Sequence, residues 1–459
     1  MRSLLNIVIL AAGQGKRMNS KLPKVLQPIS NKPMLHHVIE TAKKLNPNKL
    51  IVVYGHGGEQ VQSYVEEYFP NQITWAFQDK QLGTGHALKC ALPYLDKDGI
   101  TLVLYGDVPL ITEHTLNAII AKLNNNLVML SDIMSNPIGY GRVVRDLHNN
   151  ICAIVEEKDA STEHKKITEV NTGFYAFSNT HLEKWLNNLS SNNAQGEYYL
   201  TDVVAMAYED KLSVASIAAP YSYEVMGVNN KLQLEELERI HQVNLANQLL
   251  LNGVTLIDKK RIDIRGEVVA GQDCIIDVNC IFEGKVTLGN NVTIGAGCIV
   301  KDTSIADNVI VQAYSIIDGA QIGEHAHIGP YARLRPATKL SAGARVGNFV
   351  EIKKSTIGVG SKVNHLTYVG DSTIGNAVNI GAGTVTCNYD GQNKFNTIIG
   401  DNVFIGSGSM LVAPVTIGDN ALIAAGSVIT KNAPDNELTV SRAKQITIVG
   451  WKKRKGMKE

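Results

Sequence analysis

The sequence predicts two architectures in one chain, an α/β domain with a mostly parallel sheet and then a parallel β-helix. Over roughly the first half of the 459 residues, apolar runs that end in glycine loops alternate with helical segments. From about Ile262 to Thr430, an aliphatic residue recurs every six residues. Between these regions, an amphipathic pattern predicts one long helix from Asn229 to Leu251. The apolar face of that helix is expected to consist of Leu232, Leu237, Ile240, Leu245 and Leu249.

Composition places few limits on function. A chain of 459 residues suits two or three domains, and its net charge of +1 favours neither nucleic acid nor a membrane surface as a partner. No apolar run approaches the about 18 residues of a membrane span, and no signal-peptide pattern begins the chain. The six cysteines form no CxxC pair, so we expect small buried residues in a reducing cytoplasm. The short basic tail, WKKRKGMKE, is expected to be a solvated end.

The first apolar run, residues 5–10, leads into the glycine loop AAGQGKRM. A buried strand followed by such a loop and a helix presents backbone N–H groups to phosphate. The loop has neither the spacing of dinucleotide folds nor that of P-loops, so alone it is a weak signal. Arg17 and Lys24 follow it, and two cations beside a glycine loop suit a triphosphate. Without the loop, Lys24 would be interpreted as a solvated surface lysine.

Later segments repeat the order of strand and then loop, at residues 51–58, 73–78 and 100–110. The last of them contains Tyr105, Gly106 and Asp107. An Asp just past the carboxyl end of a strand lies where ligands collect in open α/β sheets. Together with substrate phosphates, such a carboxylate suits Mg²⁺. The alternative is that Asp107 is a helix cap or a turn residue.

The six-residue repeat describes a three-sided coil, with the aliphatic residue inside and often a glycine at the corner that follows. The steps from Ile305 to Ile322 and from Ile357 to Ile374 are each 17 residues, which shortens one side. Because no single coil buries a core, we expect about nine or ten stacked coils. Alternation in an ordinary β-sandwich has period two and no fixed glycine phase, so the repeat disfavours that fold.

The repeat breaks once, after Thr386, at CNYDGQNKFNT (387–397). Insertions in a solenoid loop out on one face and often carry function. A lone His is more often a surface residue, but cations nearby make it a candidate for chemistry on a phosphorylated substrate. Three neighbouring coils carry the polar departures from the repeat, namely Arg333, Arg335, Lys353, Lys354, His365 and Tyr368.

Over its whole length the sequence resembles the family of bifunctional enzymes that are N-acetylglucosamine-1-phosphate uridylyltransferases and glucosamine-1-phosphate N-acetyltransferases. In the first half the resemblance is carried by LAAGQGKRM, KLPKVL, QLGTGHA, YGDVPL, GYGR, IVEEKDA, NTG, NAQGEYYLTD and GVNN. In the second half it is carried by RLRP, GNFVEIKK, NHLTYVGD, NIGAGTVTCNYDG, GDNVFIGS and IAAGSVIT. Other sugar nucleotidyltransferases share the first-half motifs more loosely, whereas EIKK, HLTY and CNYDG point to the acetyltransferase half of this family.

The resemblance implies a Rossmann-like α/β nucleotidyltransferase domain over residues 1–228 and a linking α-helix over 229–251. A left-handed parallel β-helix of hexapeptide repeats, with the tail, would occupy residues 252–459. The implied enzyme is cytoplasmic, uses Mg²⁺ and makes UDP-N-acetylglucosamine. It would transfer acetyl from acetyl-CoA to glucosamine 1-phosphate, and then uridylyl from UTP to N-acetylglucosamine 1-phosphate with release of pyrophosphate. The product would feed the synthesis of peptidoglycan and lipopolysaccharide precursors.

The resemblance also implies the residues of both sites. Asp107 and Asn229 would hold Mg²⁺, and His365 would be the general base of acetyl transfer. The residues for UTP and the uridyl sugar would be Leu10, Ala11, Ala12, Gly13, Arg17, Lys24, Gln78, Gly83, Thr84, Tyr105, Gly106, Asp107, Gly141, Glu156, Asn171 and Asn229. Those for the amino-sugar phosphate would be Arg335, Lys353, Tyr368 and Asn379, and those for acetyl-CoA would be Ala382, Asn388, Tyr389, Ser407, Ala425 and Arg442.

One residue departs from the family pattern. The family loop commonly reads GxGTRM, and Lys16 stands here at the position of the Thr. Backbone N–H groups do most of the phosphate binding in such loops, so the expected reaction class is unchanged. The detailed shape of the loop is the part that this departure affects.

The chemistry of both reactions suits these residue types. Uridylyl transfer is an in-line displacement that needs positioning and charge neutralisation rather than a nucleophilic side chain. Acetyl transfer to an amine needs a base, and His, with a pKa near ~6.5, suits that role. The oxyanion of the thioester needs donors, which backbone N–H groups along the coil could supply. A three-sided prism has flat faces that can pack around a threefold axis, so we also predict a homotrimer.

Two other functions remain open at this stage. One is a sugar nucleotidyltransferase whose β-helix serves only as a platform for oligomerisation, and it would lack any activity that depends on CoA. The other is a non-catalytic regulatory subunit built on the same folds. Such a subunit would be expected to lose Arg17, Lys24 and Asp107, all of which are present.

Overall fold

The computed structural model describes residues 4–13, 15–55, 57–123, 126–449 and 451. It divides into two compact units, Met1–His241 and Gln242–Glu459. The division falls inside the longest helix, α7 (Lys231–Leu251). Among the described helices, none has the length and apolar character needed to cross a membrane. The basic tail lies outside the described residues except for Trp451.

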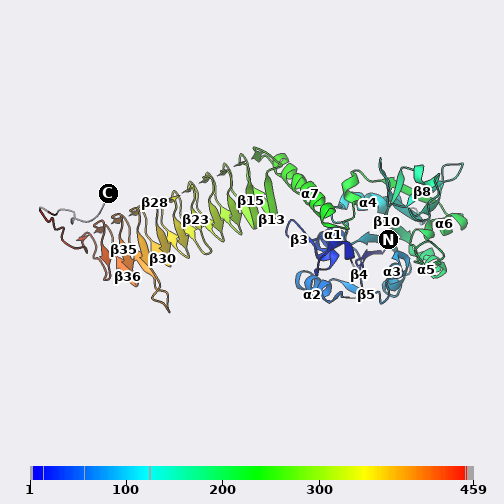
Figure 1. The fold of residues 1–459 in the computed structure, drawn as a ribbon, viewed down its shortest axis with the longest axis horizontal. Helices are drawn as coiled ribbons and strands as arrows, with labels where there is room; N and C mark the ends of the chain where they lie inside the picture. The colour runs from blue at the N-terminus through cyan, green and yellow to red at the C-terminus, as the bar shows by residue number, and fades with distance from the viewer. Residues whose placement is uncertain (1–3, 14, 56, 124–125, 450, 452–459) are drawn as a thin grey trace, which may run out of the picture. The chain divides into compact units, whose positions relative to one another are not determined.

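A twisted mixed sheet forms the centre of the amino-terminal unit (Figure 1), with strand order β11-β7-β10-β6-β1-β4-β5. Neighbouring strands are parallel except at β10, which is antiparallel to both β6 and β7. The strands of this path are β1 (Leu5–Leu10), β4 (Lys49–Tyr54), β5 (Thr74–Phe77), β6 (Ile100–Tyr105), β7 (Leu127–Ile133), β10 (Glu169–Ser178) and β11 (Val214–Ala218). The strands β8 (Arg142–Arg145) and β9 (Ile151–Val155) extend it, and β2 (Pro28–Ile29) pairs with β3 (Lys32–Pro33).

Helices cover both faces of this sheet because side chains alternate along β1. Ile7 and Ile9 pack into a core with α1, α2 and α4, whereas Val8 and Leu10 pack into a second core with α3, α5 and α6. This three-layer arrangement confirms the predicted α/β domain. The helices are α1 (Met34–Lys44), α2 (Glu59–Tyr68), α3 (Thr84–Ala91), α4 (Glu113–Lys122), α5 (Asn179–Asn188) and α6 (Asp202–Glu209). Short 3₁₀ turns lie at η1 (Lys16–Met18), η2 (Lys24–Leu26), η3 (Leu92–Tyr94), η4 (His164–Lys166) and η5 (Ser222–Val225).

The predicted apolar face of α7 is wrong at one position. Leu232 is 82% exposed, because it lies in the first turn, on the side away from the core. The residues that pack there are Leu234 and Leu237, with Ile240 one turn later. In the carboxyl-terminal unit, Gln242 exchanges two hydrogen bonds with the backbone of Ile264, of 2.8 and 2.7 Å. The end of α7 therefore caps the first coil.

The carboxyl-terminal unit is a parallel β-helix, as predicted, and its coils follow one another in chain order in Figure 1. Its interior is one continuous column of aliphatic side chains, which is how stacked repeats bury a core. One face is an eleven-stranded sheet that begins before Ile262 and ends after Thr430. Its strands are β12 (Thr255–Leu256), β14 (Ile275–Ile276), β16 (Thr293–Ile294), β19 (Ile310–Val311), β22 (His327–Ile328), β25 (Arg345–Asn348), β28 (Lys362–His365), β31 (Asn379–Ile380), β34 (Phe404–Ile405), β37 (Leu422–Ile423) and β39 (Leu438–Thr439).

The other strands of the prism form one seventeen-stranded sheet in which strands pair in parallel with strands of the next coil. They are β13 (Ile262–Ala270), β15 (Cys280–Leu288), β17 (Ile299–Lys301), β18 (Ser304–Ile305), β20 (Ile316–Asp318), β21 (Gln321–Ile322), β23 (Arg333–Leu334), β24 (Lys339–Leu340), β26 (Glu351–Lys353), β27 (Thr356–Ile357), β29 (Tyr368–Gly370), β30 (Ser372–Ile374), β32 (Val385–Cys387), β33 (Thr397–Ile399), β35 (Met410–Val412), β36 (Val415–Ile417) and β38 (Val428–Ile429).

The single break in the repeat is a loop that leaves the prism between β32 and β33 (Figure 1). It is shorter than the predicted 387–397, because Cys387 and Thr397 are themselves strand residues. We call residues 388–396 the insertion loop. An antiparallel bridge between Tyr389 and Lys394 closes it into a hairpin.

Candidate active sites

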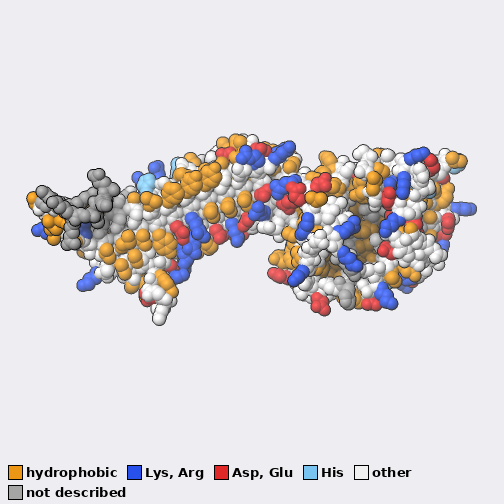
Figure 2. All heavy atoms as spheres, viewed as in Figure 1, with side chains coloured by type: hydrophobic (Ala, Val, Ile, Leu, Met, Phe, Trp, Pro, Cys, Tyr) orange, Lys and Arg blue, Asp and Glu red, His pale blue; other side chains and the backbone are white. Residues whose placement is uncertain are grey.

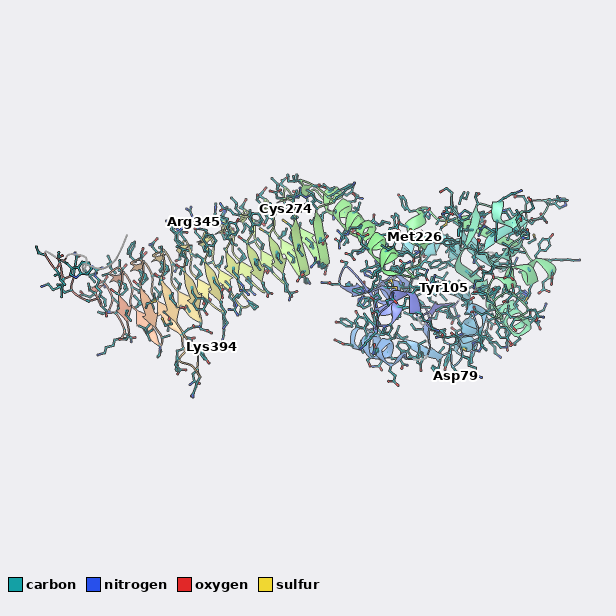
Figure 3. All side chains as sticks on the ribbon, viewed as in Figure 1. Asp79, Tyr105, Met226, Cys274, Arg345 and Lys394 are labelled. Carbon is teal, nitrogen blue, oxygen red and sulfur yellow. The ribbon has the colours of Figure 1, made fainter. Side chains whose placement is uncertain are left out.

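A pocket opens in the amino-terminal unit where β1, β5 and β6 end. Two chain segments that follow parallel strands, Ala11–Gly13 and Gln78, meet there with Tyr105 and Asp107, the position where open α/β sheets collect ligands. Tyr105 is labelled in Figure 3. We call this the strand-end pocket; its lining is Leu10, Ala11, Ala12, Gly13, Lys24, Val25, Gln78, Gln81, Gly83, Thr84, Ala87, Tyr105, Asp107 and Glu197.

The glycine loop is held against the ends of the strands by its backbone. Ala11 donates a hydrogen bond of 2.8 Å to the carbonyl of Val53, and Gly106 donates one of 3.0 Å to that of Leu10. A Cβ at Gly106 would lie 3.2 Å from the Cβ of Ala11, so a side chain at Gly106 would press on the loop. The side-chain amide of Gln81 donates to the carbonyl of Ala12. These contacts hold Ala11, Ala12 and Gly106 in place at the entrance of the glycine turn.

Beside this pocket, three cations surround the glycine turn in a second hollow, the loop pocket, where Gly15 has φ 61°. The guanidinium of Arg17 and the ammonium of Lys24 each donate a hydrogen bond of 2.9 Å to the side-chain oxygen of Asn229. Lys24 also forms an ion pair with Asp107. The third cation is Lys16, the residue that departs from the family pattern. The full lining is Gly13, Gly15, Lys16, Arg17, Lys24 and Asn229.

Asp107 and Asn229 lie far apart in the sequence, but the fold brings their side chains to one place. Val228 donates a hydrogen bond of 3.0 Å to the carbonyl of Asp107, which fixes the approach of the second segment. The oxygens of both side chains contact the same Lys24 ammonium. A carboxylate and an amide oxygen around a position that already accepts a cation are hard donors of the kind that Mg²⁺ prefers. These two residues therefore fit the predicted metal.

The three residues predicted to contact the sugar form a cluster next to the strand-end pocket. Asn171 donates a backbone hydrogen bond of 2.8 Å to Gly141, and its side-chain oxygen accepts one of 2.8 Å from Tyr175. A Cβ at Gly141 would lie 3.4 Å from a carboxylate oxygen of Glu156. Burial raises the pKa of Glu156, and nearby carboxylates add to the effect. Burial raises the pKa of Tyr105, and the charges of Glu156 and Asp107 add to the effect.

In the carboxyl-terminal unit, His365 is exposed at the end of β28. Its Nδ1 lies 2.9 Å from the side-chain oxygen of Asn348, the residue beneath it in the preceding coil. The same column continues through Ala382, Ser407 and Ala425, three of the residues predicted for acetyl-CoA. These four residues stack because the residues three positions before them are paired in register. Those pairs are Lys362↔Asn379, Asn379↔Phe404 and Phe404↔Leu422. The guanidinium of Arg442 donates a hydrogen bond of 2.5 Å to the carbonyl of Ala425, the last residue of this column.

Cations line the neighbouring face of the prism. Arg335 and Lys353 lie at equivalent positions of adjacent coils, because each lies two residues after one member of the register pair Arg333↔Glu351. Arg335 also forms an ion pair of 2.8 Å with Glu351. The hydroxyl of Tyr368 lies over Gly370, where a Cβ would meet it at 2.4 Å. These three predicted residues therefore share a face, whereas Asn379 lies on the eleven-stranded sheet.

Two residues beside this face were not predicted as site residues. Lys394, labelled on the insertion loop in Figure 3, lies next to Lys353, and the proximity of that second amine lowers the pKa of Lys394. Its position in the break of the repeat, where insertions often carry function, could have identified Lys394 as a candidate site residue from the sequence. The other is Asn348, whose contact with His365 depends on the 17-residue step between their coils. The loop residues Asn388 and Tyr389 differ, since Asn388 is buried and Tyr389 is 60% exposed.

Comparison with known proteins places both halves. Residues 7–159 match the MobA-like NTP transferase domain. Residues 396–431 match the bacterial transferase hexapeptide family, the repeat of left-handed parallel β-helices, and residues 264–342 match the GMPPB C-terminal domain. The Bifunctional protein GlmU of Chromobacterium violaceum is 55% identical over 98% of both chains, and that of Dechloromonas aromatica is 53% identical over 99% of this chain and all of its own. The Ralstonia pickettii protein of the same name is 53% identical over 98% of both chains. With both architectures and nearly the full length in common, this chain belongs to the bifunctional GlmU family.

Proposed function

We propose that this chain makes UDP-N-acetylglucosamine by two reactions at two separate sites. Acetyl passes from acetyl-CoA to the amine of glucosamine 1-phosphate on the β-helix. Uridylyl then passes from UTP to N-acetylglucosamine 1-phosphate in the strand-end pocket, with release of pyrophosphate. The observation that carries this proposal is that each compact unit contains its own cluster of polar side chains. Arg17, Lys24 and Asp107 lie at the pockets of the first unit, and His365 lies beside the cations of the β-helix in the second. We assign the first reaction to residues 252–459, the second to residues 1–228, and a linking role to 229–251.

Uridylyl transfer at the strand-end pocket needs charge neutralisation and alignment. Arg17, Lys24 and the glycine turn hold the triphosphate, while Gln78, Gly83 and Thr84 hold the nucleoside. Gly141, Glu156 and Asn171 receive the sugar. Asp107 and Asn229 hold Mg²⁺, which neutralises phosphate charge when bound. Lys24 contacts both of these residues, so it is also within reach of the phosphates that accompany the metal.

Acetyl transfer needs a base for the ammonium of the amino sugar. The side-chain oxygen of Asn348, which can only accept, lies 2.9 Å from Nδ1 of His365. In the neutral ring this contact places the proton on Nδ1, so that Nε2 is the nitrogen able to remove a proton. Arg335, Lys353, Tyr368 and Asn379 bind the sugar phosphate. Acetyl-CoA lies along the column of Ala382, Ser407 and Ala425 with Asn388, Tyr389 and Arg442. Backbone N–H groups of this column stabilise the oxyanion of the thioester.

The active form is a homotrimer, and two features of the prism support this. Hydrophobic side chains gather along its visible faces (Figure 2), where a monomer would leave them in water. Tyr314, Tyr331 and Phe349 stack at one corner with centroids 5.2 and 5.5 Å apart, and each is at least half exposed. We place the reactions in the cytoplasm, where UTP and acetyl-CoA are available. The product supplies precursors of peptidoglycan and lipopolysaccharide.

One assay tests this function. The full chain is incubated with glucosamine 1-phosphate, acetyl-CoA, UTP and Mg²⁺, and UDP-N-acetylglucosamine is sought by mass spectrometry. Omission of acetyl-CoA should abolish the product, and addition of N-acetylglucosamine 1-phosphate should restore it. If only the second reaction occurred, the chain would be a nucleotidyltransferase on an oligomerisation platform. If neither occurred, the proposed function would be wrong.

A further inference from the structure

Asp371 occupies a corner of the prism that recurs in the coils before it. The same left-handed corner is formed by Asp302, Gly319, Ala337 and Lys354 in the four preceding coils, with φ between 43° and 64°. Backbone hydrogen bonds stack these corners, for example from Ala337 to Gly319 at 3.0 Å. Of these five residues, Asp371 alone is buried, at 5% exposure. It is also the corner beneath the insertion loop.

The contacts of Asp371 explain its burial. Its Oδ2 accepts a hydrogen bond of 2.6 Å from the side-chain amide of Asn388, the first residue of the insertion loop. Its carbonyl accepts one of 3.2 Å from the N–H of Thr397, the residue after the loop. The other carboxylate oxygen lies 3.6 Å from the ammonium of Lys354. One residue of the coil thus holds both ends of the loop.

The same carboxylate lies among the cations of the amino-sugar site. The amine of Lys353 lowers the pKa of Lys394, and the charges of Asp371 and Tyr368 act in the opposite direction. Lys353, Lys354 and Lys394 with Asp371 carry a net charge of three minus one, or +2. A phosphate monoester carries about −1.5 to −2 at neutral pH. With Asp371, the charge of the cluster matches that of the phosphate. Without it, the three lysines would carry an excess of positive charge and would repel one another more strongly.

We propose that Asp371 is a positioning residue for acetyl transfer, whose buried carboxylate fixes Asn388 and allows Lys353 and Lys394 to lie together at the phosphate of the amino sugar. This rests on the acetyl transfer proposed above. Burial of a carboxylate costs free energy unless it is paired and hydrogen-bonded. Asn388 and Lys354 supply those partners here, and Asn388 is itself predicted to contact acetyl-CoA.

The experiment compares Asp371→Ala and Asp371→Asn with the same changes at Asp302. Asp302 is an exposed aspartate at the same corner without a loop above it, so it controls for the corner backbone. Ala337 shows that the corner accommodates alanine. Each full-length variant is assayed for both reactions. Amide hydrogen exchange of Phe395 and Thr397 is measured without substrates, because these N–H groups bond to Asn388 and Asp371.

Asp371→Ala should raise the KM for glucosamine 1-phosphate about ten- to a hundredfold, the loss expected for a hydrogen bond to a charged group. Exchange at Phe395 and Thr397 should accelerate, and uridylyl transfer should be unchanged. Asp371→Asn keeps an acceptor for Asn388 but loses the charge. Its alkaline limb of kcat/KM should therefore move to lower pH, because Lys394 loses the charge that favours its protonated form. The Asp302 variants should match the wild type in every respect.

Three results would overturn the proposal: a KM for Asp371→Ala within twofold of wild type, unchanged exchange in the loop, or a pH profile of Asp371→Asn that superimposes on wild type. A parallel fall in both activities with a lower Tm would equally overturn it in favour of a purely structural role. Failure of the proposed function is a separate outcome, in which the wild type releases no CoA from acetyl-CoA and glucosamine 1-phosphate. The exchange measurement would still test the role of Asp371 in that case.

Discussion

At the scale of single residues, each site depends on a side chain whose neighbour fixes its state. Asn348 holds one nitrogen of His365, and Lys24 joins Asp107 to Asn229. These neighbours come from another coil or another segment of the chain. Substitutions at His365 and Asp107 should therefore act on one reaction each, and the other reaction serves as a control within the same molecule.

His365→Ala should lower the rate of acetyl transfer about 10²–10⁴-fold, the usual contribution of a general base. Because His365 is exposed, the Tm and the rate of uridylyl transfer should remain those of the wild type. Both half-reactions and the melting temperature are measured on this variant. His327→Ala is a matched control, since His327 is an exposed residue of the same sheet two coils earlier. An acetylation rate within about threefold of wild type would exclude His365 as the base.

Asp107→Ala should abolish release of pyrophosphate from UTP and leave release of CoA intact. The substitution removes the charged partner of Lys24 and one of the two oxygen donors proposed for Mg²⁺. Pyrophosphate release is followed across a Mg²⁺ titration, with Asp98→Ala, at an exposed turn of the same unit, as the control. Loss of both activities together with the fold would contradict a local role for Asp107.

At the scale of elements, helices α1 and α7 of the amino-terminal unit meet through two partly buried histidines. The rings of His37 and His241 lie 5.2 Å apart, edge to face, and Nε2 of His37 lies 2.9 Å from the carbonyl of Ile29. Burial lowers the pKa of both, and that of His241 falls to about 4. The charge of Lys32 lowers the pKa of both further, and the charge of His37 adds to the fall at His241. At His37 the charge of His36 also lowers the pKa, while the hydrogen bond to Ile29 and the charge of Glu40 raise it. Both rings are therefore neutral in the folded unit.

This pair should make the amino-terminal unit less stable in acid. Between pH 6.5 and about 4, the unfolded chain binds more protons at these positions than the folded chain does. The stability that they contribute is complete above pH 6.5 and is lost as pH falls through that window, by at most about 1.4 kcal/mol per pH unit for each histidine. We expect His241→Leu to reduce the fall in Tm between pH 7 and 5, followed by tryptophan fluorescence. An identical fall in the variant would contradict this.

The sequence predicted regular elements well and tertiary neighbours poorly. The period of six identified the prism because every coil repeats the same inward position, and the strand-end position of Asp107 follows from local order along the chain. Burial of Asp371 could not be predicted, because Asp302 at the same corner is exposed. What differs at Asp371 is a contact with Asn388 of the insertion loop, which lies 17 residues later in the chain. Leu232 was misplaced because periodicity alone does not show where the covering core ends.

At the scale of the whole molecule, the prediction concerns association. In sedimentation, the active enzyme should have three times the mass of one chain, since closed symmetry is the default for such oligomers. Tyr331→Glu should weaken the trimer, because it would place a charge in the exposed aromatic stack between Tyr314 and Phe349. Acetyl transfer should fall with trimer content, while uridylyl transfer continues. A fully active monomer in acetyl transfer would contradict this prediction.

The insertion loop separates two demands on the sequence. The step between stacked strands is 17 residues from Thr356 to Thr373 and 25 from Thr373 to Ile398, eight more, yet the inward-facing positions stay in line. Residues can therefore enter or leave the chain at this point without moving any interior side chain. Selection for folding acts on the column inside the prism, and selection for substrate acts on a hairpin outside it. New specificities can thus arise in this architecture through changes of loop length, with the interior inherited unchanged.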